Sequence, residues 1–250
     1  MIFNSITYLL FLGTFIVLYW YFNNIRVRTI MVFSASLIFY GFWKFAFIPV
    51  MLFSVVLDYF ISMKIENSES PVRRKRLLLI SLIGNLGLLF FFKYLIFFSN
   101  NAIGLINLLG FSIDPIFYKI ILPLGISFYT FQTISYTVDV YRGHIKPERD
   151  FFLYASYVTF FPQLIAGPIL RAKEVIYQLN SIYRASSDDL YAGFKRIIYG
   201  LFLKVILADN IAPFVDLGFN SSVSQLSAID IWTLAFLFGF QIYFDFSAYS

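Results

Sequence analysis

Apolar runs of about the length of a bilayer crossing recur along this chain. A helix needs about 20 predominantly apolar residues to cross the hydrocarbon core, and runs near that length cover Ile6–Phe22, Phe45–Met63, Leu77–Phe98, Ile116–Val138 and Ile229–Phe244. The chain is 60% hydrophobic and 13% charged, whereas a soluble domain is about half apolar and about a quarter charged. The sequence therefore predicts an all-α, polytopic transmembrane helical bundle. Since no linker or repeat divides it, we expect residues 1–250 to form a single membrane domain.

Side chains that bind metals or perform thiol chemistry are almost absent. The chain has no Cys and one His, which excludes disulfides and thiol nucleophiles and leaves no metal site to be expected. The single imidazole, His144, lies in a charged loop beside Gly143 and Lys146. We interpret it as a solvated loop residue.

Basic residues gather in what we predict to be short loops between the apolar runs, namely Asn23–Arg28, Lys64–Arg76 and Arg142–Arg149. The positive-inside rule assigns such segments to the cytoplasmic side. All three fall on one side if the N-terminus is outside, and the nearly uncharged segment Ser99–Pro115 then falls on the other. The net charge of +5 is thus interpreted as a topology signal, and no nucleic-acid partner is expected.

The first half contains a predicted helical pair. A short helix over Ile30–Trp43 precedes Phe45–Met63, with a hinge near Lys44 and Pro49. Asp58 lies in the second helix, and we interpret it as a carboxylate that faces the interface or is paired with another helix.

The second half contains less regular elements. Phe151–Ile165 is shorter than a span, so we expect a re-entrant helix, with a full crossing as the alternative. Ser186 and Asp189 have the spacing of a capping box and begin a basic amphipathic helix, which lies either at the interface or in the wall of a polar cavity. Residues 210–216, which include Pro213, are expected to open a loop.

The stretch Phe160–Arg171 interrupts the apolar sequence with two prolines, a glycine, an amide and an arginine. An irregular backbone at membrane depth must be buried in protein or line a polar cavity. Polar groups there, such as Gln163 and Arg171, indicate a functional site. A simple kink between two helices is the alternative.

This stretch also carries a family resemblance. Phe161–Ile169 with Arg171 resembles the signature of the membrane-bound O-acyltransferases, most closely their alginate O-acetyltransferase branch. Leu122–Gln132, Tyr136–Gly143 and Gln241–Ser250 resemble the same branch, in the same order. The resemblance spans most of the chain, although the first hundred residues match only in hydrophobic pattern.

The resemblance implies an enzyme that transfers acetyl groups towards the hydroxyls of an exported, alginate-like polysaccharide. It implies acetyl-CoA or a similar acyl donor as substrate, no bound cofactor, and a periplasmic or extracellular partner protein that completes the transfer. It places the protein in the cytoplasmic (inner) cell membrane, surrounded by lipid.

Acyl transfer to a hydroxyl requires a general base and stabilisation of the oxyanion. In the resembled family the catalytic His lies in a motif with Trp and His, well downstream of the Phe-Asp-Phe-Ser-like segment. Nothing in these 250 residues matches that motif. The resemblance therefore implies that the chain is the N-terminal half of the enzyme, that the catalytic His lies downstream of Ser250, and that the chain alone is inactive.

What the chain is expected to supply is the substrate channel. Polar residues and helix breaks within the family-like motifs are the candidates, namely Gln132, Gln163, Gly167, Pro168, Arg171, Gln241 and Asp245. These residues either line the channel or satisfy backbone groups freed at the breaks, and for the glutamines both interpretations stay open. For Asp245 we favour the functional interpretation, because an unpaired carboxylate in lipid costs ~3 kcal/mol or more.

Other functions stay open beside acetyl transfer. D-alanyl or other acyl transfer to a cell-envelope polymer is the nearest alternative. A non-catalytic transporter or scaffold belongs to a different class. Transport predicts a broken helix in each of two repeats, and the sequence shows no such internal symmetry.

Overall fold

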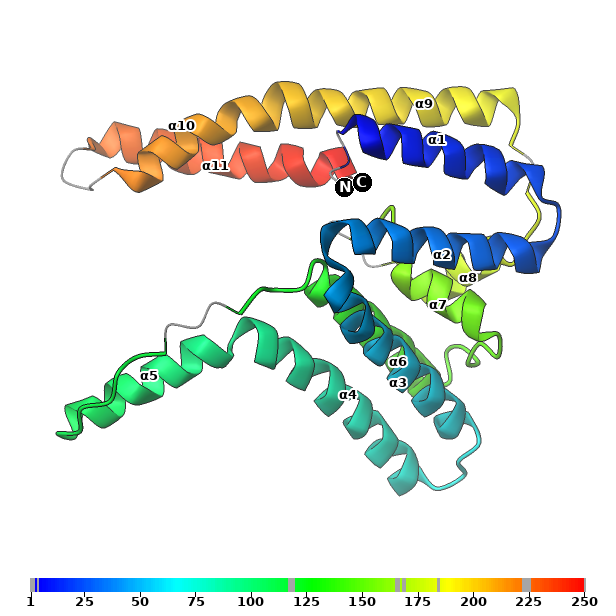
Figure 1. The fold of residues 1–250 in the computed structure, drawn as a ribbon, viewed down its shortest axis with the longest axis horizontal. Coiled ribbons are helices and arrows are strands. Elements are labelled where there is room, and N and C mark those ends of the chain that lie inside the picture. The colour runs from blue at the N-terminus through cyan, green and yellow to red at the C-terminus, as the bar shows by residue number, and fades with distance from the viewer. Residues whose placement is uncertain are drawn as a thin grey trace. The chain divides into compact units, whose positions relative to one another are not determined.

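The computed structural model describes residues 3, 5–116, 120–164, 167, 170–183, 185–221 and 226–249. These residues form helices and turns and no strand (Figure 1), which confirms the predicted all-α class. They divide into two compact units, each described by itself below. Unit 1 comprises Met1–Trp20, Ala166–Pro168 and Tyr183–Ser250, and unit 2 comprises Tyr21–Ile165 and Ile169–Ile182.

Unit 2 contains the helices α2 to α8, several of which begin at side-chain caps. Their bounds are α2 Ile25–Lys44, a 3₁₀ turn Phe45–Phe47, α3 Ile48–Glu66, α4 Pro71–Lys93, α5 Leu95–Leu108, α6 Ile126–Arg142, α7 Phe151–Thr159 and α8 Ala172–Leu179. The side chains of Asn24, Ser70 and Asp150 accept backbone N–H bonds at the starts of α2, α4 and α7. The 3₁₀ turn between α2 and α3 confirms the predicted hinge near Lys44.

The core of unit 2 lies where α3, α4, α6 and α7 pack together. In the nine-residue helix α7, every side chain from Leu153 to Thr159 is buried. Tyr136 of α6 packs against Tyr154 of α7 with ring centroids 4.6 Å apart. Aromatic burial therefore supplies much of the packing area between these short helices.

Two predicted basic loops are wrong in their bounds. Asn24 caps α2, so Arg26 and Arg28 lie within the helix, where the Arg28 Nε donates to the Phe22 carbonyl at 2.6 Å. Ser70 caps α4, which begins with a proline, so the basic run of residues 73–76 is helical and only residues 67–70 connect α3 to α4. The capping hydrogen bonds allow both helices to begin before these basic residues, although polar composition is typical of loops.

The segments around residue 100 also differ from expectation. The helix predicted over Leu77–Phe98 is two helices, because Tyr94 has a non-helical backbone (φ −120°) between α4 and α5. Helix α5 runs to Leu108, so much of Ser99–Pro115 is helical. The predicted crossing Ile116–Val138 becomes helical only at Ile126, after Gly125, and residues 117–119 of it lie outside the described residues.

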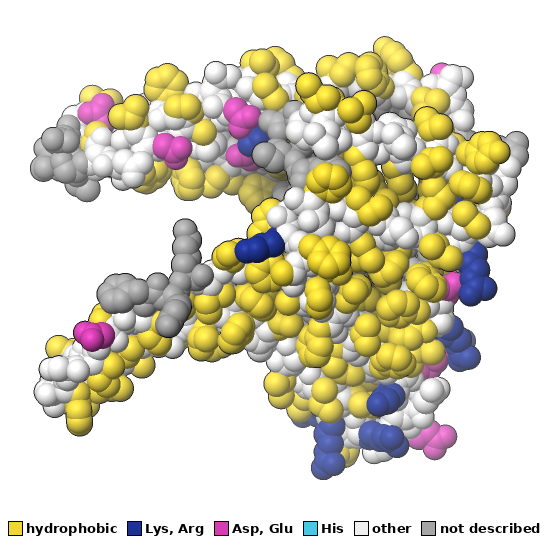
Figure 2. All heavy atoms as spheres, in the orientation of Figure 1, with side chains coloured by type: hydrophobic (Ala, Val, Ile, Leu, Met, Phe, Trp, Pro, Cys, Tyr) yellow, Lys and Arg dark blue, Asp and Glu magenta, His cyan; other side chains and the backbone are white. Residues whose placement is uncertain are grey.

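The basic segments of unit 2 nevertheless lie at one end of it. Arg74 Nη2 donates to the Tyr141 carbonyl at 2.6 Å, and Arg149 lies 3.6 Å from Glu66. Figure 2 shows Lys and Arg side chains gathered over the end where α3 meets α4. The ends of α3 and α6 and the start of α4 therefore share one basic end.

Unit 1 contains α1 Ile6–Tyr21, α9 Ser187–Leu201, a π-helical segment Phe202–Ala208, α10 Asp209–Asn220 and α11 Ala228–Tyr249. The predicted capping box is confirmed, because Ser186 Oγ accepts from the Asp189 N–H and the Asp189 carboxylate accepts from the Ser186 N–H. The loop predicted at residues 210–216 is wrong. The chain there is helical, with Pro213 inside α10, as neighbouring groups allow in membrane helices.

Four helical stretches of the described residues are long and apolar enough to cross a membrane. They are Ile25–Glu66, Pro71–Lys93, Ser187–Asn220 and Ala228–Tyr249. The helix predicted to be amphipathic thus continues into a 34-residue stretch of spanning length. The shorter apolar helices α1 and α5 fall below that length.

Candidate functional site

Two of the expected channel residues, Gln132 and Gln163, are hydrogen-bonded to each other. Gln132 lies on α6, and Gln163 lies in the turn that follows α7. The Nε2 of Gln163 donates to the Oε1 of Gln132 at 2.8 Å. The Nε2 of Gln132 in turn donates to the backbone carbonyl of Tyr157 at 2.8 Å. Both amide side chains are buried, so they form a polar contact inside the apolar core of unit 2.

The turn that carries Gln163 is held from two sides. On one side, the backbone N–H of Phe161 donates to Ser36 Oγ of α2 at 3.2 Å. On the other, Gly125 lies directly against the carbonyl of Leu164, where any Cβ would overlap the oxygen. Gly125 also has φ +68°, which favours glycine. The start of α6 and the turn therefore fit only with glycine at this position.

Gln163 retains one unused hydrogen-bonding atom. Its Oε1 is buried and has no hydrogen-bond partner among the described residues. A buried acceptor left without a donor costs about 1–3 kcal/mol. The hydroxyl of Tyr157 donates to the Leu170 carbonyl at 3.1 Å and so anchors the backbone on the far side of the break. The arrangement can accept a hydrogen bond from a hydroxyl group.

The remaining expected residues of the break are less informative. Pro168 lies outside the described residues. Gly167 belongs to unit 1, whereas Gln163 belongs to unit 2. Arg171 is exposed at the N-cap of α8, and its side chain makes no capping bond there.

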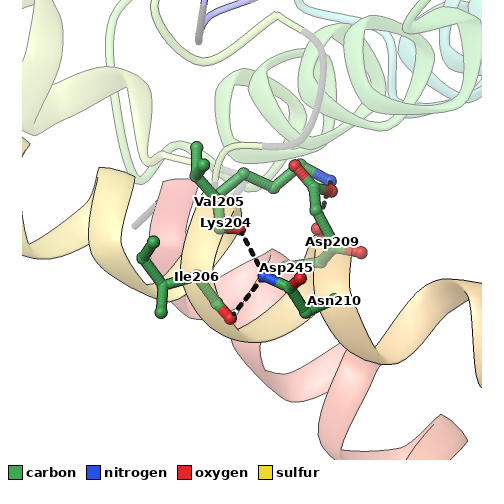
Figure 3. A network of polar contacts seen from close by, with 6 residues as sticks. All are labelled: Lys204, Val205, Ile206, Asp209, Asn210 and Asp245. Atoms are coloured by element: carbon green, nitrogen blue, oxygen red, sulfur yellow. Dashed lines mark hydrogen bonds and ion pairs between the residues drawn. The ribbon is translucent and has the colours of Figure 1, made fainter.

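Asp245 in unit 1 has a partner that was not expected. Lys204 Nζ donates to Asp245 Oδ1 at 2.6 Å and lies 2.9 Å from Asp209 Oδ1. Figure 3 shows this lysine on the π-helical segment, between carboxylates from α10 and α11. The expectation that Asp245 is unpaired is therefore wrong, because the wide π turn presents Lys204 to α11.

One amide, Asn210, lies beside this ion-pair network (Figure 3), and a second, Gln241, lies on the same helix as Asp245. Asn210 Nδ2 donates to the carbonyls of Val205 and Ile206 at 3.1 and 2.9 Å (Figure 3), which satisfies backbone groups at the end of the π segment. Gln241 lies one helical turn before Asp245 on α11, and its Oε1 is buried without a partner among the described residues. The two expected residues of α11 therefore share one helix face.

A third polar cluster, around Asp58, was not predicted as a site. Its carboxylate is 0% exposed and accepts from Ser81 Oγ at 2.5 Å and Asn85 Nδ2 at 2.8 Å, both on α4. Thr133 Oγ1 lies 3.4 Å from Asn85 Oδ1 and links the cluster to α6. The helix-paired interpretation of Asp58 is confirmed. The signal that was missed is Ser81 and Asn85, four residues apart on one face of an apolar helix.

His144 lies outside these clusters. Its side chain is 61% exposed, and its Nδ1 lies 3.4 Å from Asp139 Oδ1, five residues earlier. The interpretation of His144 as a solvated loop residue is confirmed. No group of three or more His, Cys, Asp or Glu side chains in the described part of the chain is arranged to hold a metal ion.

Comparisons with known proteins found relatives that are named for the transfer of acetyl or D-alanyl groups. No protein-family model matches the chain, and no solved structure matches it. The chain is 36% identical to a peptidoglycan O-acetyltransferase of Helicobacter pylori over 96% of its own length and 49% of the relative's. It is 36% identical to a "probable alginate O-acetylase AlgI" of Azotobacter vinelandii, over 100% and 50%. A teichoic acid D-alanyltransferase of Bacillus subtilis is 25% identical over 53% and 34%.

The chain thus spans about half the length of the curated relatives that it matches over its full extent. Their similarity covers the motifs on α6 and α11 and the break after α7, together with the first hundred residues that matched only in pattern. The described residues also contain four helical stretches that are long and apolar enough to cross a membrane. The chain is a multi-pass membrane protein that is similar, over nearly its whole length, to about half of each of these O-acetylating relatives.

Proposed function

We propose that the protein to which this chain belongs transfers acetyl groups towards the hydroxyls of an exported cell-envelope polysaccharide. The observation that carries the proposal is the 36% identity, over nearly the whole chain, to relatives named as O-acetylases of peptidoglycan and of alginate. These names concern those proteins, and they differ in the polymer. The shared chemistry is acetyl transfer to a sugar hydroxyl, which is the part that we assign here.

The described residues supply positioning groups for this reaction and no general base. His144 has a side chain that is 61% exposed and lies in a loop. The catalytic His is therefore proposed to lie outside this chain, and residues 1–250 alone are proposed to be inactive and to form part of one larger membrane domain. The acyl donor is acetyl-CoA or a similar thioester, used as a substrate.

The Gln132–Gln163 pair is the proposed contact of this chain with the hydroxyl acceptor. The free Oε1 of Gln163 accepts a hydrogen bond from the hydroxyl, and the bonds to Gln132 and from there to Tyr157 hold the amide in place. A hydrogen bond that orients the acceptor brings the reacting atoms together without taking part in bond making. Gln163 is therefore a positioning residue.

The test is Gln163→Leu in the full-length protein, expressed in cells that lack the endogenous gene. Ester-linked acetate on the exported polysaccharide is expected to fall by about tenfold, the scale of one lost hydrogen bond of about 1.4 kcal/mol. Gln178→Leu is the matched control, because this glutamine is exposed on α8. Unchanged acetylation in Gln163→Leu, at equal amounts of protein in the membrane, would contradict the role of the pair.

The basic end of unit 2 supports a proposed orientation. We propose that this end faces the cytoplasm, that the N-terminus is outside, that the membrane is the cytoplasmic one, and that a periplasmic or extracellular protein completes the transfer. Because the chain is free of cysteine, Glu69→Cys places a single thiol at an exposed position between α3 and α4. Its reaction with an impermeant reagent in intact cells would reverse the orientation.

D-alanyl transfer is the second candidate, supported by the 25% identity to a teichoic acid D-alanyltransferase over 141 residues. The same cells distinguish the two reactions, since mild alkali releases acetate in one case and D-alanine in the other. Release of neither, in a strain with verified expression, would favour the transporter or scaffold alternative.

A further inference from the structure

An apolar groove runs along α3 and the N-terminal half of α4. It has a volume of about 680 Å³, and its apolar lining includes Pro49, Phe53, Val56 and Phe60 of α3 and Leu77 and Ile80 of α4. Among the described residues that line the groove, Lys64 alone is charged. Lys64 belongs to the last turn of α3, so this charge lies at one end of the groove.

The groove follows one face of α3. Val56, Phe60 and Lys64 recur every four residues, which is the spacing of side chains on one helix face. Asp58 and most other buried residues of α3 lie on the opposite face, toward the core of unit 2. From Pro49 to Lys64 the helix rises by about 22 Å, whereas one leaflet contributes about 15 Å to the hydrocarbon core. The groove is therefore long enough to hold one lipid acyl chain.

Two arginines continue the α4 side of the groove at its charged end. Arg73 and Arg76 lie one turn before the two groove residues of α4, four positions earlier in each case, and so share their helix face. Only residues 67–70 connect α3 to α4, which places both arginines at the same end as Lys64. All three cations are exposed, and none of them forms an ion pair with another described residue.

The negative charges at this end do not balance the positive ones. Residues 64–76 contain five basic and two acidic residues, which gives a net charge of +3. One of the two acids, Glu66, lies 3.6 Å from Arg149, and the other, Glu69, is exposed between α3 and α4. An apolar groove that ends in cations complements a molecule with a long apolar chain and an anionic end.

We propose that this groove binds one anionic phospholipid. One acyl chain lies along the groove, and the phosphate lies near Lys64, Arg73 and Arg76. Both helices belong to stretches that are long and apolar enough to cross a membrane, so acyl chains surround the groove. Clusters of Lys and Arg beside a spanning helix attract anionic lipid headgroups. The groove adds a defined place for the acyl chain of the same molecule.

A helix from the rest of the full-length protein is the competing occupant. Such a helix would bury the apolar side chains of the groove equally well. It would also need acidic residues at one end to match the three cations, whereas an anionic phospholipid carries both parts in one molecule. The two occupants predict different responses to lipid, so experiment separates them.

The test titrates the full-length protein, in a neutral detergent, with dioleoyl phosphatidylglycerol or dioleoyl phosphatidylcholine and counts bound lipids by native mass spectrometry. The first phosphatidylglycerol is expected to bind at least about fivefold more tightly than the first phosphatidylcholine. Lys64→Gln is expected to weaken phosphatidylglycerol by about fivefold, the contribution of one cation near an anionic lipid. Val56→Trp fills the groove and is expected to weaken both lipids.

Lys75→Gln is the matched control. This exposed lysine belongs to the same basic run but lies on the opposite face of α4, so its removal is expected to leave the binding of both lipids unchanged.

Three results overturn the proposal. Equal binding of the two lipids to wild type shows that no anionic headgroup is recognised. Equal weakening by Lys64→Gln and Lys75→Gln shows a general attraction between a basic surface and anionic lipid. Unchanged phosphatidylglycerol binding in Val56→Trp shows that the acyl chain lies elsewhere or that another segment fills the groove. None of these measurements depends on acetyl transfer.

Discussion

The carboxylates of Asp58 in unit 2 and Asp245 in unit 1 both lie in helices of spanning length, but protein groups compensate them differently. Asp58 is completely buried and accepts hydrogen bonds from a hydroxyl and an amide of α4. Asp245 is 29% exposed and pairs with Lys204, which is 23% exposed. Short neutral donors on adjacent helices fit inside a packed core, whereas a lysine requires room for its long side chain and its charge. The burial of an acid therefore depends on the size of its partner as well as its charge.

Breaking the neutral cluster is expected to have the largest effect. Asn85→Leu keeps the side-chain volume but removes the amide that donates to Asp58, so one carboxylate oxygen loses its donor inside the core. A buried charged group that loses a hydrogen bond costs about 2–4 kcal/mol. The measurement is the loss of free energy of unfolding of the full-length protein in detergent. Asn101→Leu is the control, because this exposed amide donates only to a carbonyl of its own helix α5.

The close contact between Gly125 and the Leu164 carbonyl is tested by Gly125→Ala. The added Cβ would overlap the Leu164 carbonyl and would also occupy a left-handed backbone position. We expect a loss of about 2–3 kcal/mol, of which about 1 kcal/mol comes from the backbone conformation alone. Gly143→Ala isolates that backbone part, because Gly143 has φ +75° with nothing near its Cβ position. Equal losses in the two variants would contradict the tight contact.

The charged pair of unit 1 is expected to contribute less. A double-mutant cycle of Lys204→Met and Asp245→Asn should give a coupling energy of about 1–2 kcal/mol, because partial exposure weakens the interaction. Added salt should reduce this coupling. A coupling energy indistinguishable from zero would show that the pair is incidental to stability.

The smallest effect is expected at His144, an ionisable group outside both clusters. His144→Ala should leave acetylation of the polymer within about twofold of wild type, since its side chain is 61% exposed and its Nδ1 lies near Asp139 of its own segment. Acetate content of the isolated polymer is the measurement. A decrease of about a hundredfold, the scale of a lost general base, would make this loop the active site.

Local patterns in the sequence predicted several features correctly. The hinge after Lys44, the capping box at Ser186 and the exposure of His144 each depend on a few neighbouring residues, and each is confirmed. The Gln132–Gln163 contact was half predicted. The two residues were identified from their motifs, but the bond between them joins positions 31 residues apart. A pattern of neighbouring residues cannot predict a contact between positions so far apart in the sequence.

The errors have a common physical origin. Polar side chains were taken to mark loops, yet Arg26 lies in a capped helix and Asn210 bonds back to carbonyls of the helix before it. In the first case the side chain of Asn24 caps the helix that contains Arg26, and in the second the Asn210 amide bonds to helix carbonyls. Helix formation then continues through residues whose composition is typical of loops.

The sequence alone determined the all-α class and the membrane environment, and it showed motifs that resemble those of an acyltransferase, because length, hydropathy and residue order are properties of single segments. Only the tertiary structure decided which polar groups meet. Asp58 accepts hydrogen bonds from Ser81 and Asn85 on the next helix, and Asp245 accepts one from Lys204 of the π-helical segment. In lipid every buried polar atom requires a partner. Which atom becomes that partner depends on how the helices rotate and pack against each other.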